Sequence, residues 1–296
     1  MNNQFKTIGI IGKPSDSRIV DTLSNLINYL AEKNEAIYVD SKCAALLDID
    51  FIIPCNINQI GKTCDIVIAV GGDGTFLSAM RALVDTSTPL LGINLGRLGF
   101  LVDISPEDMQ IKLNNILNGQ FIEENRFLLH AKIVREQEII HQEFAVNEVV
   151  VHRWTTPTMI ELVTHINGVY LNAQRSDGLI ISTPTGSTAY SLSAGGPILH
   201  PCLNALVLVP LNPHTLSNRP IVIDDDSEIE ITFRKTRQMN ALVSCDHLDI
   251  PDVLMSDKVV ITKHPNPIKI LHPEDQDFFH ILRKKLDWSS GYHVQS

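Results

Sequence analysis

The residues with the clearest chemical potential form a turn of three glycines around one acid, Gly71-Gly72-Asp73-Gly74, followed by Thr75. Glycine has no Cβ, so the glycines are able to adopt positive φ and to let a polyphosphate reach the backbone N–H groups. Asp73 does not fit a pure anion site, because bound phosphates repel a carboxylate. The acid therefore either holds a metal or takes a proton from an attacking hydroxyl. The alternative is a tight turn with a solvated acid.

A second stretch, residues 175–197, is dense with hydroxyl groups and small residues. Its hydroxyl and N–H groups suit sugar oxygens, phosphates and adenine edges, and Tyr190 is able to stack or to hydrogen-bond. Ser187 or Thr188 is expected to cap a following helix. The alternative is an ordinary turn rich in Ser and Thr. The absence of G-x-S-x-G argues against a serine nucleophile.

A polar pair, Asn147-Glu148, interrupts the apolar stretch 144–151, which predicts a single strand. Adjacent residues of a strand point to opposite faces, so at least one of the two is expected to be buried and to need a partner. A ligand ribose or adenine is one such partner. A polar pair on an edge strand is the alternative.

The first part of the chain alternates strands and helices, which predicts an α/β unit with a parallel sheet. Residues 65–70 form a β-branched apolar run that predicts a strand buried on both faces, and a helix is expected over 75–83. Asp16 or Ser17 is expected to cap the first helix. The other predicted strands are 6–11, 36–39 and 90–93, and the other predicted helices begin near 18, 43 and 106.

The pattern changes at Phe121, after which short strand-like runs follow one another and predict a mostly antiparallel, β-rich domain. Asn167-Gly168 predicts a two-residue hairpin turn. A final helix over 277–286 is expected to pack on the first domain. We therefore predict an α/β domain of residues 1–120 plus 268–296, and a β-rich domain of residues 121–267.

Composition narrows the class of protein. The chain has 296 residues, 44% of them hydrophobic, and a formal charge of -10, which argues against a nucleic-acid or anionic-membrane surface. The five cysteines form no C-x-x-C pair and predict reduced thiols. No run is long enough to span a membrane and no leader is evident, so we expect a cytoplasmic protein without membrane or nucleic-acid partners.

Taken together, these motifs resemble those of the bacterial NAD kinases. The resemblance rests on the Gly71 to Thr75 turn, the glycine-rich stretch Gly92 to Leu101, Asn147-Glu148, the Asp177 to Pro197 run and Pro213 to Pro220. It covers almost the whole chain in the right order.

The resemblance implies transfer of the ATP γ-phosphate to the 2′-hydroxyl of the adenosine ribose of NAD, which gives NADP. It also implies a C-terminal domain like a β-sandwich, a tail that returns to the first domain, and a site between the domains. The implied assembly is a homotetramer or homodimer. The implied metal is a divalent cation, Mg²⁺, carried with ATP, and NADP or NADPH would bind as product or inhibitor.

Site residues follow from the resemblance position by position. Asp73 resembles the proton acceptor, and Gly71, Gly72, Gly74 and Thr75 form the phosphate turn. The implied NAD contacts are Asp73, Gly74, Asn147, Glu148, Thr158, Arg175, Asp177, Thr185, Thr188, Ala189, Tyr190, Ser191, Leu192 and Ser193. The chain departs from the family at Ser78, Thr158, His247 and Leu248.

Two other functions remain open. A lipid kinase shares the glycine-Asp turn, but it would not explain Asn147-Glu148 or the Thr185 to Ser193 turn. A non-catalytic NADP(H) sensor would bind anions better without Asp73. The use of NADH or polyphosphate is left undecided.

Overall fold

The computed structural model describes residues 5–33, 36–96, 99–154, 158–234 and 241–288. The chain divides into two compact units, Met1–Asn125 with Ile268–Ser296, and Arg126–Pro267. The sequence predicted that the first domain ends at residue 120. In the structure the first unit continues to Asn125, because β6 (Ile122–Arg126) forms an edge of its sheet.

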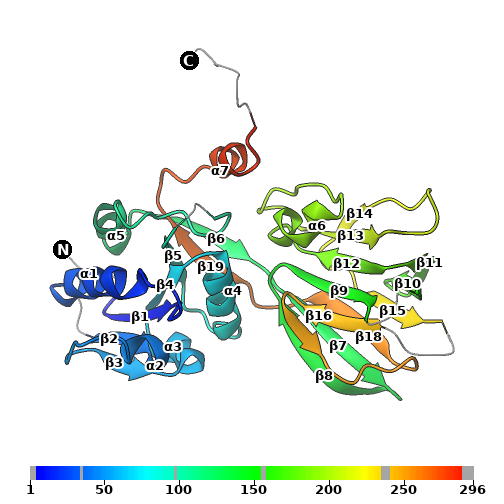
Figure 1. Cartoon of the computed structure of the whole chain (residues 1–296), viewed down its shortest axis with the longest axis horizontal. Helices are drawn as coiled ribbons and strands as arrows, with labels where there is room; N and C mark the ends of the chain where they lie inside the picture. Colours follow the sequence, from blue (N-terminus) through cyan, green and yellow to red (C-terminus); the bar gives the residue numbers. More distant parts are fainter. Residues whose placement is uncertain (1–4, 34–35, 97–98, 155–157, 235–240, 289–296) are drawn as a thin grey trace, which may run out of the picture. The chain divides into compact units, whose positions relative to one another are not determined.

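The first unit is built on a seven-stranded sheet in the order β3-β2-β1-β4-β5-β19-β6 (Figure 1). Strands β1 to β5 and β19 pair in parallel. Their bounds are β1 Thr7–Gly12, β2 Ala36–Asp40, β3 Ile53–Cys55, β4 Ile66–Gly71, β5 Leu90–Asn94 and β19 Ile268–His272. The tail thus returns to the first unit as a strand beside β5.

Helices cover both faces of this sheet. On one face, α1 (Ile19–Ala31) and α5 (Met109–Leu117) share a core with Ile8, Ile10 and Ile68. On the other face lie α3 (Ile57–Thr63) and α4 (Asp73–Ala82), where Ile60 packs on Gly9 and Phe76 on Gly92. The first unit also contains α2 (Ser41–Ala44) and α7 (Phe278–Lys285).

The order of the strands places a topological switch point between β1 and β4. From β1 the chain continues to β2 and β3 on one side, while β4 is followed by β5 on the other side. Ligands of open α/β sheets bind at the carboxyl ends of the strands where the order reverses. The Gly71 to Gly74 turn follows β4 at this edge of the sheet.

Two local predictions for this unit were wrong. The first turn of α1 has Arg18 as its N-cap without a side-chain cap, so neither Asp16 nor Ser17 caps the helix. Asp16 instead accepts the backbone N–H of Arg18 at 3.1 Å. Neither β3 nor α3 was predicted from sequence. The apolar residues of this segment are too few to show the spacing of a strand or a helix.

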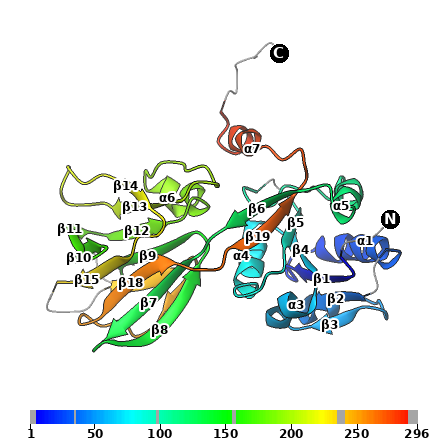
Figure 2. The ribbon, with the colours of Figure 1, turned by 180° about the vertical axis from the view of Figure 1, so that it is seen from behind.

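The second unit consists of two six-stranded antiparallel sheets, visible from behind in Figure 2. Their orders are β11-β10-β15-β18-β7-β8 and β14-β13-β12-β9-β16-β17. The strands are β7 Leu129–Arg135, β8 Glu138–Ala145, β9 Glu148–Arg153, β10 Ile160–Ile166, β11 Val169–Ser176, β12 Gly178–Ser182, β13 Ala205–Leu211, β14 Ile221–Asp224, β15 Ile229–Phe233, β16 Ala241–Cys245, β17 Leu248–Ile250 and β18 Lys258–Lys263. Inward-facing residues of both sheets form one core, which makes the unit a β-sandwich.

The hairpin at Asn167-Gly168 is confirmed, with φ of 50° and 75° at the two turn residues. The single strand predicted over 144–151 was wrong. The chain leaves β8 at Ala145 and begins β9 at Glu148, and the two strands belong to different sheets. The polar pair therefore marks the crossing between sheets.

Among the described residues, no helix has both the length and the apolar composition that a membrane span requires.

Candidate active site

Asp73 is the first residue of α4, and its carboxylate is held from one side by the loop after β5. Its Oδ2 accepts the N–H of Phe100 at 2.9 Å, and its Oδ1 accepts the N–H of Leu101 at 3.1 Å. These two bonds fix the carboxylate plane and leave lone pairs on both oxygens for another donor.

Gly99 makes this contact possible. A Cβ at residue 99 would lie 1.9 Å from Asp73 Oδ1 and 2.7 Å from its Cγ. Any side chain there would displace the carboxylate or the loop. The backbone of this loop therefore binds the acid directly.

The glycines of the phosphate turn do not use their freedom to adopt positive φ. None of Gly71, Gly72 and Gly74 is among the positive-φ residues, and Gly72 is extended with φ −103°. The lack of a Cβ atom at these glycines instead provides space. A Cβ at Gly71 would meet Thr75 Oγ1 at 2.3 Å, whereas Cβ atoms at Gly72 or Gly74 would meet nothing within 4 Å. The last two glycines therefore leave backbone open to a ligand.

A cavity of about 340 Å³ lies beside these glycines at the carboxyl edge of the sheet. Its walls come from the ends of β1, β2 and β4 and from α4. The lining residues are Ile11, Gly12, Lys13, Pro14, Asp40, Lys42, Ile57, Gly72, Gly74, Thr75 and Ser78. The Ser78 hydroxyl donates to the carbonyl of Gly74 at 3.0 Å, within its own helix.

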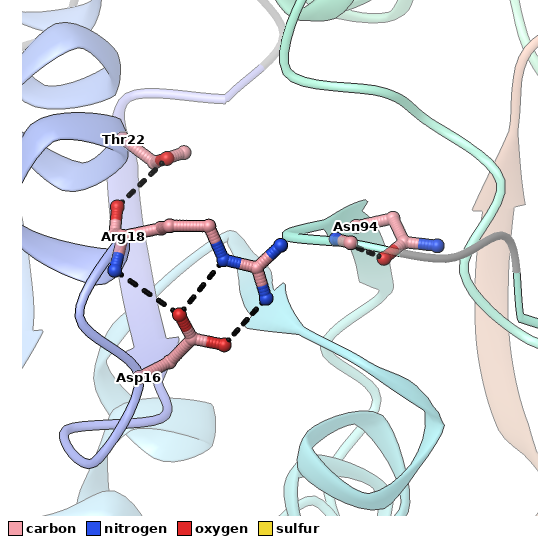
Figure 3. Close-up of polar contacts among 5 residues, drawn as sticks. Asp16, Arg18, Thr22 and Asn94 are labelled. Carbon is pink, nitrogen blue, oxygen red and sulfur yellow. Dashed lines mark hydrogen bonds and ion pairs between the residues drawn. The ribbon is translucent and has the colours of Figure 1, made fainter.

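A larger cavity of about 940 Å³ lies in the same unit, between the start of α1, the loop after β5 and α7. Figure 3 shows Arg18 extending from α1 toward Asn94 while both Asp16 oxygens bind its guanidinium. Six acidic residues line this cavity (Asp21, Asp103, Glu107, Asp108, Asp275 and Asp277). Asp275 pairs with Lys112, so this cavity is a poor match for a polyphosphate.

In the second unit the structure brings Asn147 and Glu148 together with the hydroxyl-rich turn. The Asn147 carbonyl accepts the N–H of Thr183 at 2.9 Å, and a Cβ at Gly186 would lie 2.2 Å from that carbonyl oxygen. Asp246 holds the pair from the other side, because its carboxylate accepts the N–H groups of Asn147 at 2.8 Å and Glu148 at 3.3 Å.

Glu148 is buried, with 6% of its surface exposed, and its Oε2 has no hydrogen-bond partner among the residues that the structure describes. Burial, followed by repulsion from Asp246, raises the pKa of Glu148 to about 8, although the backbone N–H of Tyr190 opposes the shift. At neutral pH the side chain is therefore largely a neutral acid that is able to donate a proton to a ligand oxygen.

This pKa predicts a pH-dependent stability. The folded chain holds the Glu148 proton more tightly than the unfolded chain. The resulting stabilisation of the folded chain is therefore full below about pH 4.5 and is lost as pH rises through about 8. We expect the fall in Tm between pH 5 and pH 9 to be smaller in Glu148→Gln than in the natural chain. The corresponding loss in the free energy of unfolding of the natural chain is on the order of a few kcal/mol, at about 1.4 kcal/mol per pKa unit. Thermal unfolding across this range provides the measurement. Glu138→Gln, at an exposed position of β8, is the control, and an identical pH dependence for Glu148→Gln would contradict the prediction.

The remaining predicted contacts of the second unit lie in three places. Asp177 lies between β11 and β12, pairs with Arg153 at 2.8 Å and accepts from Asn212 at 2.9 Å. Arg175 pairs with Glu161 at 3.3 Å on β10. Thr158 is exposed in a bend just before β10.

The turn 185–193 is a short 3-10 helix, η1 (Gly186–Thr188), followed by α6 (Tyr190–Ser193). The capping expected from Ser187 or Thr188 was wrong, because Ala189 precedes α6 and no side chain caps it. Ser187 donates to the Pro184 carbonyl at 2.6 Å, and Thr188 donates to the Thr185 carbonyl at 3.2 Å. These hydroxyls stabilise the turn itself.

Two supporting residues were missed from sequence. Arg126, which is 5% exposed, donates to the Thr185 hydroxyl at 2.9 Å, and Asp246 positions the polar pair. Both act across long sequence separations, which no local pattern reveals. The departures His247 and Leu248 are exposed at the hairpin between β16 and β17.

These features define a class before any comparison. A doubly wound α/β unit presents an acid beside an open glycine turn, and a β-sandwich unit presents buried polar groups suited to a nucleoside. This combination is typical of a nucleotide-dependent phosphotransferase acting on a hydroxyl.

Comparison with known proteins specifies the family. Residues 8–121 match the ATP-NAD kinase N-terminal domain, and residues 146–272 match the ATP-NAD kinase C-terminal domain. The chain therefore belongs to the ATP-NAD kinase family. It is 53% identical to the NAD kinase of Methylococcus capsulatus over 98% of this chain and 100% of that protein, and 48% identical to that of Nitrosomonas europaea over 96% of both chains.

Solved structures agree with this fold. The chain is similar to an Archaeoglobus fulgidus NAD kinase in complex with ATP, with a TM-score of 0.73 and 25% identity over 95% of this chain and 99% of that chain. It also shares the fold of yeast NADH kinase complexed with NADH, with a TM-score of 0.89 and 24% identity over 100% of this chain and 91% of that chain.

Proposed function

We propose that this chain phosphorylates the 2′-hydroxyl of the adenosine ribose of NAD with ATP and that Asp73 is the proton acceptor. One observation carries the proposal for Asp73. Its carboxylate is fixed by two backbone N–H groups beside glycines whose backbone is open to a ligand. A sugar hydroxyl is a weak nucleophile, so phosphoryl transfer depends on alignment, charge neutralisation and removal of one proton.

In the proposed step the ribose 2′-oxygen attacks the γ-phosphorus of ATP. The bond from that phosphorus to the β,γ-bridging oxygen breaks, ADP leaves with the bond electrons, and the hydroxyl proton passes to Asp73. The ATP substrate brings a divalent cation, Mg²⁺, which neutralises phosphate charge. Because two backbone N–H groups already fix the Asp73 carboxylate, it faces the hydroxyl without having to change its side-chain rotamer.

The proposed dinucleotide contacts include Gly74 in the first unit. In the second unit they include the pair Asn147 and Glu148, with Thr158, Arg175, Asp177 and Thr185, and the residues from Thr188 to Ser193. Glu148 supports this assignment most strongly, because its buried Oε2 needs a partner and its raised pKa lets it donate to a ligand oxygen. Ser191 offers a second such group, a buried hydroxyl whose Oγ has no partner within the described part of the chain.

Ser191 and Ser187 form a matched pair for testing these contacts. We expect Ser191→Ala to leave Tm unchanged and to weaken NAD binding roughly fivefold, since a net hydrogen bond contributes about 1 kcal/mol. Ser187 is already satisfied, accepting from Leu199 N at 3.0 Å and donating to Pro184 O at 2.6 Å. Ser187→Ala should therefore lower Tm. Calorimetric titration with NAD and thermal unfolding distinguish the two, and the reverse pattern would contradict a ligand role for Ser191.

We further propose a homotetramer or homodimer, with NADP or NADPH binding as product or inhibitor. Exposed apolar side chains on the edge strand β11, namely Val169 (70% exposed) and Tyr170 (59%), support self-association. Light scattering on the natural chain and on Tyr170→Asp tests this assembly. A cytoplasmic location is also proposed, and the five free thiols support it.

The test of the function is NADP formation from NAD and ATP with Mg²⁺, detected with an NADP-specific dehydrogenase. Phosphorus NMR of the product then identifies the phosphorylated ribose position. We expect a 2′-phosphate. NADPH binding without NADP formation would instead support the sensor, and phosphorylation of a diacylglycerol in place of NAD would support the lipid kinase.

A further inference from the structure

We propose that His272 is a positioning residue for the phosphoryl transfer and that it acts through Asp103 on loop 99–104, which orients Asp73. This inference rests on the proposed role of Asp73 and adds to it a residue that lies outside the ligand contacts. It follows from an ion triad in the first unit and from the connection between that triad and the loop.

His272 ends β19, which lies between β5 and β6 in the sheet (Figure 1). Its side chain is buried, and each ring nitrogen faces one carboxylate. Nδ1 lies 3.1 Å from Asp103 Oδ2, and Nε2 lies 3.0 Å from Glu124 Oε2 on β6. A ring nitrogen beside an ionised carboxylate has to donate a hydrogen bond, so both nitrogens carry protons and the ring is an imidazolium.

The surroundings of His272 favour this charged form. Burial lowers the pKa of His272, but the hydrogen bonds to Asp103 and Glu124 and the charges of these acids outweigh burial and raise the pKa to about 9. The side-chain exposure is 5% for His272 and 13% for each acid. Separating such a buried charge from its partners is costly. The triad therefore fixes the position of Asp103 relative to β19 and β6.

Asp103 is connected to Asp73 by a short and well-packed piece of chain. Leu101 precedes Asp103 by two positions and donates its N–H to Asp73 Oδ1 at 3.1 Å. Val102 lies between them, is 1% exposed and abuts β5, since a Cβ at Gly92 would lie 3.0 Å from Val102 Cγ1. Because close-packed interiors transmit strain, a displacement of Asp103 also moves the N–H group of Leu101.

Loop 99–104 depends on side-chain contacts for its position. Only its last residue, Ile104, bridges β5, and residues 99–103 belong to no helix or strand. Asp103 supplies one contact by pairing with His272. Lys285 of α7 supplies another, because its Nζ lies 5.6 Å from the centre of the Phe100 ring. Both contacts come from the C-terminal tail, which therefore braces the loop that binds Asp73.

A triad with a purely structural role would stabilise the sheet without affecting Asp73. The chain offers a matched control for this alternative, because Lys269 of β19 pairs with Glu123 of β6 at 3.2 Å. This ion pair joins the same two strands, but it is partly exposed and includes no residue of loop 99–104. Lys269→Gln should therefore leave kcat for NADP formation within about twofold of the natural value.

Two substitutions of His272 separate the roles of its two nitrogens. The amide nitrogen of asparagine is placed roughly like Nδ1 and that of glutamine roughly like Nε2. His272→Asn therefore keeps a donor for Asp103, whereas His272→Gln keeps one for Glu124 and loses the bond to the loop. We expect kcat to fall roughly tenfold in His272→Gln and less than about threefold in His272→Asn, with KM for NAD within about twofold in both. Equal losses of kcat in the two variants would overturn the proposal.

Asp103→Ala tests the same route from the other partner and leaves His272 its Glu124 contact. We expect kcat to fall roughly tenfold, and the same substitution in a His272→Gln background to add less than about threefold. Additive losses would overturn the route through Asp103. Asp103→Ala also serves if the substitutions of His272 do not fold, because a natural kcat in this variant would contradict the proposal.

Hydrogen exchange at the N–H groups of Phe100 and Leu101, followed by NMR on the full chain, tests the bracing independently of catalysis. We expect exchange to be roughly tenfold faster in His272→Gln than in the natural chain and unchanged in Lys269→Gln. Unchanged exchange in His272→Gln would overturn the positioning role, whether or not the chain forms NADP. Faster exchange without NADP formation by the natural chain would support the bracing, and the proposed function alone would fail.

Discussion

Replacing Asp73 by asparagine is expected to lower kcat for NADP formation by about 10²- to 10⁴-fold, the range typical of a lost general base. Asparagine keeps the shape but cannot take the proton of the ribose hydroxyl. The NH₂ group of asparagine is not a hydrogen-bond acceptor. The variant therefore also loses one of the two hydrogen bonds that the N–H groups of Phe100 and Leu101 donate to Asp73. The measurement is steady-state kcat at saturating NAD and ATP.

NAD affinity, measured by calorimetric titration, is the control for Asp73→Asn. We expect it to change by less than about fivefold, because the other proposed contacts remain. Asp73→Ala should lose a similar fraction of kcat. A variant that retains natural kcat would leave the kinase assignment standing and remove Asp73 from the mechanism.

A methyl group at Gly99 is expected to lower kcat by roughly 10²-fold, because displacement of a catalytic group by about 1 Å has effects of this size. A Cβ there would lie 1.9 Å from Asp73 Oδ1, so the carboxylate or the loop has to move. Gly99 is a positioning residue and acts through Asp73. We therefore expect Gly99→Ala to reduce kcat more than it raises KM for NAD.

A double-mutant cycle tests this route. In an Asp73→Ala background there is no carboxylate to displace, so adding Gly99→Ala should lower the residual rate by less than about threefold. Thermal unfolding shows whether Gly99→Ala remains folded. Equal losses from Gly99→Ala in both backgrounds would mean that the glycine serves another purpose.

Local pattern predicted much of the fold. The buried run before Gly71 became β4, Asn167-Gly168 became a hairpin turn, and the change of pattern near Phe121 precedes the β-sandwich. Each of these signals lies within a few residues of the feature it predicts. The break between β8 and β9 coincides with the polar pair Asn147-Glu148, but two polar residues within an apolar run do not distinguish a change of sheet from a polar pair inside one strand.

Candidate site residues could be named from sequence, but their physical surroundings could not. The bonds from Phe100 to Asp73 and from Asn147 to Asp246 join segments far apart in the chain. The pKa of Glu148 likewise depends on its burial and on two groups distant in the chain, the Asp246 carboxylate and the backbone N–H of Tyr190. Such properties arise from tertiary packing and are absent from any local motif.

The central claim is direct transfer of the γ-phosphoryl group to NAD, with Asp73 as the proton acceptor. A single-turnover experiment with γ-labelled ATP, NAD and excess protein tests it most directly, with the natural chain and Asp73→Asn quenched in parallel. The account predicts that the label passes to the 2′-position of the dinucleotide in the natural chain, slows by at least about 10²-fold in Asp73→Asn, and is not found on the protein. Label on Asp73 as an acyl phosphate, or equal transfer by both chains, would contradict it.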